Sequence, residues 1–187
     1  MRVISGTSKG LRITAPKGNK VRPAADKVKG AIFNILGDLS EMKVLDLFAG
    51  SGSVGIEALS RGAQECVFVE SDRHTASFIK RNLDHCGLDA DGQILIMQVL
   101  PSIRLLSRKK RVFDILFVDP PYDKGWVNRT LALLEDSPLL HSHSQIVVEH
   151  SPRELPQPKE ALEIFDQRRY GQTIITFLKL KALGARR

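Results

Sequence analysis

Residues 44–55 have the sequence VLDLFAGSGSVG, and this stretch decides the fold. An apolar run typical of a buried strand leads into a glycine-rich turn, and a helix is expected to follow from Ser53. The three glycines fit the G-x-G-x-x-G pattern, in which glycine lets the backbone approach a bound ligand closely. We call residues 46–55 the glycine loop. Taken alone, the pattern is the fingerprint of dinucleotide-binding enzymes, so an NAD-dependent oxidoreductase has to be considered.

Two acidic residues, Asp46 and Glu70, bear on which cofactor the glycine loop holds. Asp46 ends the first strand, where a carboxylate would repel the pyrophosphate that a dinucleotide places at the following helix. S-adenosylmethionine has no phosphate and carries an α-ammonium group and a sulfonium, both positive, which an acid can hold. Glu70, at the end of the next expected strand, suits the ribose hydroxyls of either cofactor. A capping or turn role for Asp46 and an exposed strand end for Glu70 stay open.

Farther out, apolar runs alternate with helical stretches on both sides of the glycine loop. Such alternation indicates a parallel sheet that is covered by helices on both faces. Two β-prone runs near the C-terminal end predict an antiparallel hairpin. The fold class expected is therefore α/β, with a mostly parallel seven-stranded sheet and an antiparallel C-terminal hairpin. Strands are expected at residues 44–48, 66–70, 94–99, 114–118, 145–149, 163–169 and 173–179, and helices at 26–36, 53–60, 75–86 and 126–134.

The N-terminal end carries the excess positive charge of the chain. The 187 residues include 28 basic and 21 acidic side chains, a formal net charge of +7. Residues 1–35 hold eight basic side chains and one acidic side chain, so the remainder is neutral. A concentrated cationic segment suggests a polyanionic partner, most often nucleic acid, whereas a solvated, disordered basic arm is the alternative. Two short β-prone runs favour a β-hairpin arm over residues 1–24, followed by a domain over residues 25–187.

A second motif ends the fourth expected strand. Asp119-Pro120-Pro121-Tyr122 places two rigid prolines at the carboxyl end of the sheet, where doubly wound folds bind ligands. The aspartate carboxylate and a proline carbonyl can accept the two N–H bonds of a planar exocyclic amine. The tyrosine ring can stack on the base, an interaction worth about 1–3 kcal/mol. A rigid loop with a capping aspartate and a packing tyrosine is the alternative.

Composition argues against several other classes of protein. No apolar run approaches the roughly 20 residues that span a membrane, and the start MRVISG lacks the apolar stretch of a signal peptide. Two cysteines cannot build a disulfide framework or a four-ligand zinc site, so reduced thiols are expected. These features predict a cytoplasmic protein without a metal site.

Taken together, DLFAGSG at residues 46–52, Glu70 and DPPY at residues 119–122 resemble the class I S-adenosylmethionine-dependent methyltransferases that act on amino nitrogens. The segments RVISG at residues 2–6 and GIEALSRGA at residues 55–63 resemble the RsmD family. Members of that family are 16S rRNA (guanine(966)-N(2))-methyltransferases. The resemblance implies a Rossmann-like fold, S-adenosylmethionine as cofactor with S-adenosylhomocysteine as product, and 16S rRNA in a small-subunit particle as substrate. A monomer is expected, because nothing in the sequence demands more.

The resemblance also assigns roles to individual residues. Asp119 and Pro120 would hold the guanine 2-amino group, and Tyr122 would stack on the extruded base. The cofactor would be bound by Asp46, Phe48, Ala49, Gly50, Ser51, Gly52, Glu70, Ser71, Leu100 and Asp119. The basic residues expected to contact RNA phosphates are Arg2, Lys9, Arg12, Lys17, Lys20, Arg22 and Lys29.

A few positions depart from the family pattern. Where family members have threonines and a glutamate around the Arg-Pro pair of the arm, this chain has Ala24, Ala25 and Gly30. At the end of the third expected strand, Val99 replaces the polar side chain that the family places over the adenine. Adenine binding would then depend on apolar packing and on the backbone amide of Leu100.

Two alternative functions stay open on the residues alone. Adenine N6 or cytosine N4 amines in RNA or DNA suit the same Asp-Pro-Pro-Tyr arrangement, so the tetrad does not separate them from guanine N2. The NAD-dependent oxidoreductase is more remote, because no candidate acid or base for hydride transfer accompanies the glycine loop.

Overall fold

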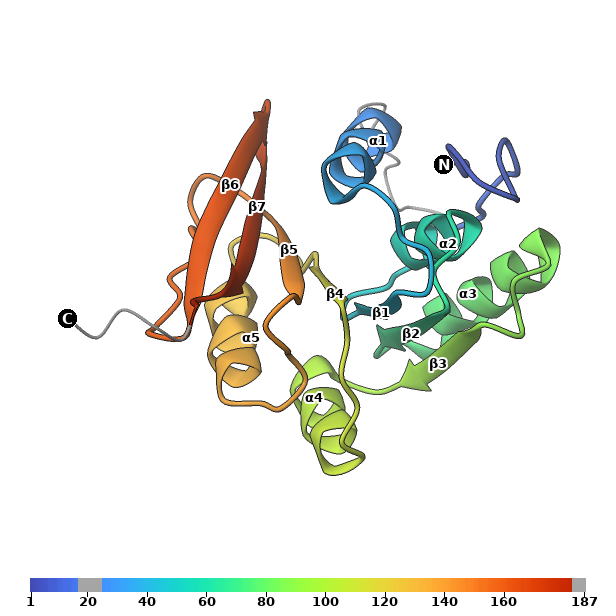
Figure 1. The fold of residues 1–187 in the computed structure, drawn as a ribbon. Helices are drawn as coiled ribbons and strands as arrows, with labels where there is room; N and C mark the ends of the chain where they lie inside the picture. Colours follow the sequence, from blue (N-terminus) through green and yellow to red (C-terminus); the bar gives the residue numbers. More distant parts are fainter. Residues whose placement is uncertain (17–24, 183–187) are drawn as a thin grey trace. The chain divides into compact units, whose positions relative to one another are not determined.

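The computed structural model describes residues 1–16 and 25–182 (Figure 1). The chain divides into two compact units, unit 1 over residues 1–99 and unit 2 over residues 100–187, and each is described by itself. None of the helices within the described ranges is long and apolar enough to cross a membrane.

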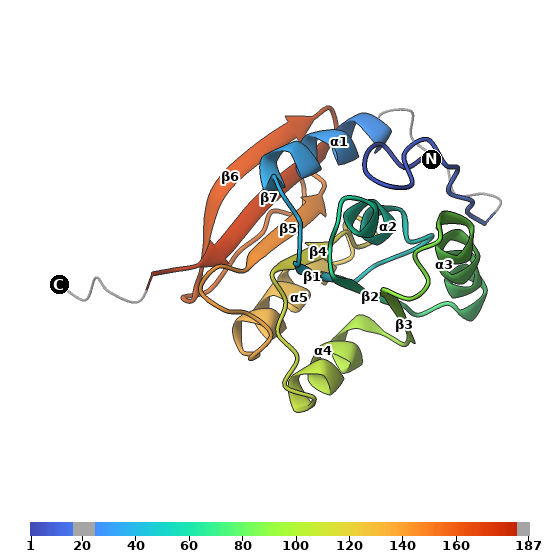
Figure 2. The same ribbon diagram turned by 45° about the vertical axis from the view of Figure 1, so that its right-hand side comes forward.

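Unit 1 contains three parallel strands in the order β3-β2-β1. The central residues of β1 and β2 are buried, as expected of strands in a sheet covered on both faces. Helix α2 packs on β1 and β2, and α3 packs on β2 and β3 (Figure 2). The elements are β1 (Lys43–Asp46), β2 (Glu65–Glu70), β3 (Gly92–Ile96), α1 (Ala25–Leu36), α2 (Ser53–Ser60) and α3 (Arg73–Cys86).

Local sequence explains where the helices of unit 1 begin and end. Asp72 caps α3, because its carboxylate accepts the backbone N–H of Thr75 at 2.7 Å. Gly87 ends α3 with a φ of 67°, the left-handed conformation that glycine adopts without strain. In α2, a Cβ added to Gly55 would lie 2.3 Å from the ring of Phe68, so this glycine is required for the close packing of α2 on β2.

Unit 2 contains four strands in the order β4-β5-β7-β6. Strands β4 and β5 are parallel, whereas β7 pairs antiparallel with both β5 and β6. Figure 1 shows β6 and β7 as a long pair, and Gly171 turns the chain between them with a φ of 64°. The elements are β4 (Ile115–Val118), α5 (Trp126–Glu135), β5 (Gln145–His150), β6 (Leu162–Tyr170) and β7 (Thr173–Leu180), preceded by α4 (Val99–Arg108) at the boundary of the units.

The predicted fold class is confirmed: within each unit the strands pair in parallel, except that β7 pairs antiparallel with β5 and β6, and helices alternate with the strands up to β5. Two strand ends and one helix differ from the prediction. The first strand, expected over residues 44–48, ends at Asp46, and the third, expected over residues 94–99, ends at Ile96. Val99 is instead the first residue of α4, a helix that was not predicted. Val99 is buried at the start of α4, and an apolar run of this length does not distinguish the end of a strand from the start of a helix.

The described part of the N-terminal arm, residues 1–16, has less β structure than the expected hairpin. A single antiparallel bridge joins Arg2 to Arg12, with the N–H of Val3 donating to the carbonyl of Leu11 at 3.0 Å. Val3 and Ile13 are buried, so this segment is folded into unit 1 and is not a solvated arm. The boundary predicted between residues 24 and 25 stays a prediction.

Candidate functional site

Asp46 lies at the carboxyl end of β1 with its side chain directed to the start of α2. The residue is 2% exposed, and its Oδ2 accepts the backbone N–H of Gly55 at 3.3 Å. Burial raises the pKa of Asp46 to about 7, against the opposing effect of hydrogen bonds from the Gly55 and Phe48 amides. The bond from the Gly55 N–H, in the first turn of α2, agrees with the alternative in which Asp46 has a capping role. The carboxylate also suits a cation, because a positive group beside it would favour the ionised form.

Glu70 joins the end of β2 to the glycine loop. Its Oε2 accepts the N–H of Gly50 at 3.1 Å, and its Oε1 accepts the N–H of Asp72 at 2.8 Å. The structure therefore places Glu70 beside the loop, and its role toward the ribose stays a prediction. A carboxylate has about four acceptor positions, so these bonds leave capacity for a hydroxyl donor.

The other predicted cofactor residues lie on or beside this loop, except Leu100 and Asp119, which belong to unit 2. Gly50 and Gly52 have φ values of 54° and 82°, and the N–H of Gly52 donates to the carbonyl of Ala49 at 2.7 Å. Phe48 is half-buried, Ala49 and Ser51 are buried, and Ser71 is exposed. Leu100 belongs to unit 2, in the first turn of α4, where helical N–H groups have no intrahelical acceptor.

The tetrad, residues 119–122, follows β4 in unit 2. Asp119 is exposed, Pro120 is buried and Tyr122 is half-buried. The hydroxyl of Tyr122 donates to Glu149 Oε1 at 2.7 Å and lies 3.0 Å from Thr173 Oγ1. The phenol is thus held by residues of β5 and β7 that sequence reasoning missed. An acid in the last positions of an apolar strand was the available signal for Glu149.

Glu154 fixes the chain that follows the tetrad. Its two oxygens accept the N–H groups of Lys124 at 3.1 Å and Val127 at 3.0 Å. Glu154 is buried, and these bonds satisfy amides before and within the first turn of α5. The segment between Tyr122 and α5 is therefore tied to the chain that follows β5.

The basic residues predicted to contact RNA fall into three groups. Arg2, Lys9 and Arg12 are exposed on the arm, as a phosphate contact requires. Lys17, Lys20 and Arg22 lie outside the described residues.

Lys29 corrects the prediction. Its side chain is 6% exposed, and its Nζ lies 3.3 Å from Glu57 Oε2 and donates to the carbonyl of Arg2 at 2.8 Å. An ammonium group enclosed in this way does not reach an RNA phosphate. Lys29 is instead an internal link between α1, α2 and the arm.

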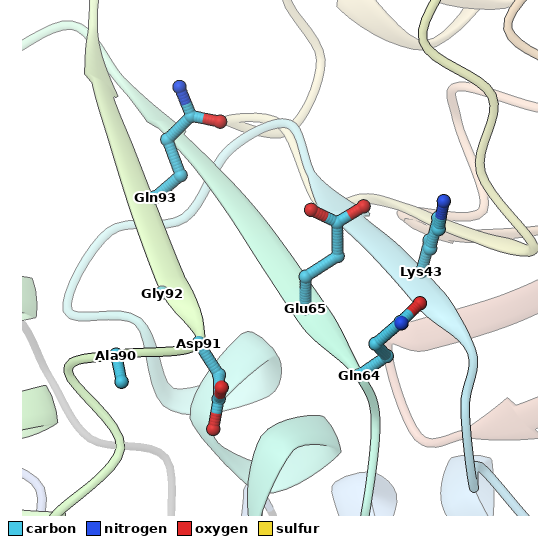
Figure 3. A pocket seen from close by; sticks show the side chains of 7 residues that line it. All are labelled: Lys43, Gln64, Glu65, Ala90, Asp91, Gly92 and Gln93. Atoms are coloured by element: carbon cyan, nitrogen blue, oxygen red, sulfur yellow. The ribbon is translucent and has the colours of Figure 1, made fainter.

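A polar hollow of about 360 Å³ lies at the opposite edge of the unit 1 strands (Figure 3). It is at the first residues of β1, β2 and β3, whereas ligands of parallel α/β sheets bind at the carboxyl ends. The glycine loop therefore remains the candidate site. The hollow is lined by Lys43, Gln64, Glu65, Ala90, Asp91, Gly92 and Gln93.

Known proteins of similar sequence and structure point to the same kind of site. The solved structure of yhhF from Escherichia coli superposes with a TM-score of 0.85 and 28% identity, covering 97% of this chain and 98% of that one. The fold and the glycine loop define a class I methyltransferase. YlbH of Bacillus subtilis is 36% identical over 181 residues, 96% of this chain and 98% of that protein.

The particular family follows from the matched residues. Ribosomal RNA small subunit methyltransferase D of Escherichia coli strain K12 is 34% identical over 150 residues, 80% of this chain and 74% of that protein. Residues 1–179 match the family described as conserved hypothetical protein 95, and the chain belongs to this family, the RsmD family expected from its sequence. Membership decides against the NAD-dependent oxidoreductase.

Proposed function

We propose that the chain methylates the exocyclic N2 amine of a guanine in 16S rRNA, of the guanine 966 type, with S-adenosylmethionine as methyl donor. A similar protein of Escherichia coli is a ribosomal RNA small subunit methyltransferase, which supports rRNA of a cytoplasmic small-subunit particle as substrate. The observation that carries the proposal is the tetrad after β4, with Tyr122 held by its hydroxyl in a member of this family.

The residues of the glycine loop fit this cofactor. The buried carboxylate of Asp46 suits the α-ammonium group, because the nearby cation would offset the cost of ionising it. Gly50 and Gly52 have no side chains, so the backbone of the loop can approach the cofactor closely. Glu70 suits the ribose hydroxyls. When bound, S-adenosylmethionine supplies an electrophilic methyl group on a sulfonium.

In this proposal the tetrad of unit 2 orients the amine. The guanine amine is a poor nucleophile because its lone pair is delocalised into the ring, so positioning is the main contribution of the protein. The Asp119 carboxylate and the Pro120 carbonyl accept its two N–H bonds and stabilise the positive charge that develops on nitrogen. The ring of Tyr122 stacks on the base, and Asp119 takes up the proton that the nitrogen releases.

The arm would hold the RNA through its phosphates. Arg2, Lys9 and Arg12 are exposed, and a base inside a duplex cannot reach the tetrad, so the target guanine must be unpaired or extruded. Replacing Lys9 and Arg12 with glutamine should reduce the slope of log affinity against log salt by about 1.4–1.8, since each phosphate contact contributes about 0.7–0.9. Point substitutions are preferable to deletion because Val3 and Ile13 are buried.

The decisive experiment is mass spectrometry of nuclease-digested rRNA after incubation with labelled S-adenosylmethionine. Small-subunit particles and naked 16S rRNA are compared as substrates, and N2-methylguanosine is expected. Methyladenosine or N4-methylcytidine instead would move the assignment to another amino base. Asp119→Ala should abolish transfer, whereas Asp136→Ala, an exposed aspartate of unit 2, should keep parental turnover. Equal turnover of Asp119→Ala and the parent would contradict the proposed site.

A further inference from the structure

Asn82 joins the arm directly to the glycine loop. The residue lies on α3 and is 2% exposed. Its Nδ2 donates to the backbone carbonyl of Ser51 at 2.9 Å and to that of Thr14 at 2.8 Å. Its Oδ1 accepts the backbone N–H of Thr14 at 3.0 Å and the Thr14 hydroxyl at 2.9 Å. One buried amide therefore contacts both segments.

The hydrogen-bonding capacity of this amide is fully used. An amide side chain has two N–H donors and two acceptor lone pairs, and the four bonds of Asn82 account for all of them. The orientation of the amide is also fixed, because the carbonyls of Ser51 and Thr14 are acceptors and must face Nδ2. A displacement of Thr14 would break bonds at the same group that holds Ser51.

Lys29 forms a second link of the same kind. Its Nζ donates to the carbonyl of Arg2 at 2.8 Å and to Ser53 Oγ at 3.1 Å. The two ends of the arm hairpin are thereby tied to Ser51 and Ser53, the residues on either side of Gly52. All of these residues belong to unit 1.

We propose that Asn82 is a positioning residue through which RNA binding by the arm and cofactor binding by the glycine loop strengthen each other. The inference rests on the proposed function, which assigns RNA to the arm and the cofactor to the loop. RNA bound to the basic side chains of the folded arm restrains it further, and with it Thr14, which holds the amide that fixes the Ser51 carbonyl. The cofactor then binds a loop whose remaining motion is already reduced, and by linkage the effect is reciprocal.

The test measures the affinity for S-adenosylhomocysteine by calorimetry, with and without a 16S rRNA hairpin that contains an unpaired guanine. Asn82→Asp keeps the size of the side chain and its acceptor toward Thr14, but sets a carboxylate oxygen against two carbonyls. Saturating RNA should tighten ligand binding at least fivefold in the parent, within the usual range of allosteric coupling, and less than twofold in Asn82→Asp. Asp84→Asn, the reverse exchange at an exposed position of α3, is the matched control and should keep the parental factor.

The outcomes separate this inference from the proposed function. An equal tightening factor in the parent and Asn82→Asp, or no tightening in the parent, would overturn the coupling while leaving methyl transfer intact. If no variant binds S-adenosylhomocysteine, the proposed function fails, and the link is tested by amide hydrogen exchange alone. Asn82→Asp should then accelerate exchange in the arm and in the glycine loop together, whereas parental exchange in either segment would refute the link.

A second variant covers the case in which Asn82→Asp does not fold. Thr14→Val removes the hydroxyl bond to Oδ1 and leaves the backbone bonds in place. The RNA-induced tightening factor should fall to a value between that of the parent and one. Amide hydrogen exchange at the glycine loop should also accelerate, although Thr14 is not part of that loop. Parental behaviour in both measurements would overturn the inference.

Discussion

The carboxylate of Glu57 accepts the backbone N–H of Ile4 at 2.7 Å, which fastens helix α2 to the N-terminal arm. Glu57 is fully buried, and it also pairs with Lys29 at 3.3 Å and with Arg61 at 2.8 Å. Burial lowers the pKa of Lys29, and Glu57 opposes that effect. A buried ion pair of this kind costs much desolvation, so its value depends on both partners being present.

Replacing Glu57 with glutamine should therefore destabilise the protein strongly. The variant keeps the side-chain volume but leaves the Lys29 ammonium buried without its counter-ion, a loss of about 3–5 kcal/mol in the free energy of unfolding. Urea unfolding measures the change. Glu163→Gln, which breaks an exposed pair with Lys179, should stay within about 0.5 kcal/mol of the parent. Similar values for the two variants would show that Glu57 does not fasten the arm.

The turn of the arm offers a second test, at two glycines with nearly the same backbone conformation. Gly6 and Gly10 have φ values of 86° and 88°, but a Cβ on Gly6 would lie 1.6 Å from the Ser60 carbonyl oxygen, whereas a Cβ on Gly10 meets nothing within 4 Å. Gly10→Ala should cost about 1–2 kcal/mol from backbone strain alone. Gly6→Ala should cost more and detach the turn from α2, which limited proteolysis of the arm detects. Equal resistance of the two variants to protease would refute the close approach.

Much of this fold follows from the pattern of apolar residues. Strands β1 and β2 are buried apolar runs, and Gly87 marks the end of α3 through its left-handed conformation. The boundary at Val99 could not be predicted, because burial in a helix and burial in a strand select the same residue types. A local pattern also does not reveal which unit an element packs in.

The candidate site was predictable where adjacent parallel strands bring residues together. The carboxyl ends of adjacent parallel strands meet at one edge, so the bond between Glu70 and Gly50 follows from topology. Lys29 was misassigned because net charge does not show whether a cation has a buried partner. An acid within the apolar turn of α2, Glu57, was the signal for such a partner. No pattern indicated Asn82, whose partners are 31 and 68 positions away.

The raised pKa of Asp46 makes stability depend on pH. Its pKa is about 7 in the folded protein against an ordinary value of 3.8, so the folded state holds a proton that the unfolded state has released between these values. The contribution of Asp46 to stability is thus complete below about pH 4 and is lost as the pH rises through about 7. Asp46→Asn should remove this dependence, which reaches about 1.4 kcal/mol per pH unit.

Urea unfolding of the parent and Asp46→Asn at pH 5 and pH 8 measures this difference. The comparison with the variant is needed because His150 acts in the opposite direction: burial lowers its pKa, so its contribution is present above about pH 6.5 and is lost on acidification. The parent should lose more stability than the variant between the two pH values. Parallel pH profiles would show that Asp46 titrates in its ordinary range.

The same carboxylate predicts the pH dependence of cofactor binding. The ionised form of Asp46 suits the α-ammonium group of S-adenosylhomocysteine, so affinity should rise as the pH increases from about 6 to about 8. Asp46→Asn should bind more weakly and lack this rise. Calorimetry at three pH values within this range is sufficient. A rise that persists in Asp46→Asn would assign the titration to another group.

The two tyrosines of the chain separate stacking from anchoring at the tetrad. Tyr122→Phe keeps the ring that the proposed function places on the base, but it loses the bonds to Glu149 and Thr173. The rate of methyl transfer at saturating cofactor should fall about five- to twelvefold, the loss of roughly 1–1.5 kcal/mol of positioning. Tyr122→Ala should lose a further 1–3 kcal/mol of stacking, about 5- to 150-fold. Tyr170→Phe, at the turn between β6 and β7, is the matched control and should keep the parental rate. If Tyr122→Phe were as fast as Tyr170→Phe, the phenol hydroxyl of Tyr122 would not position the ring.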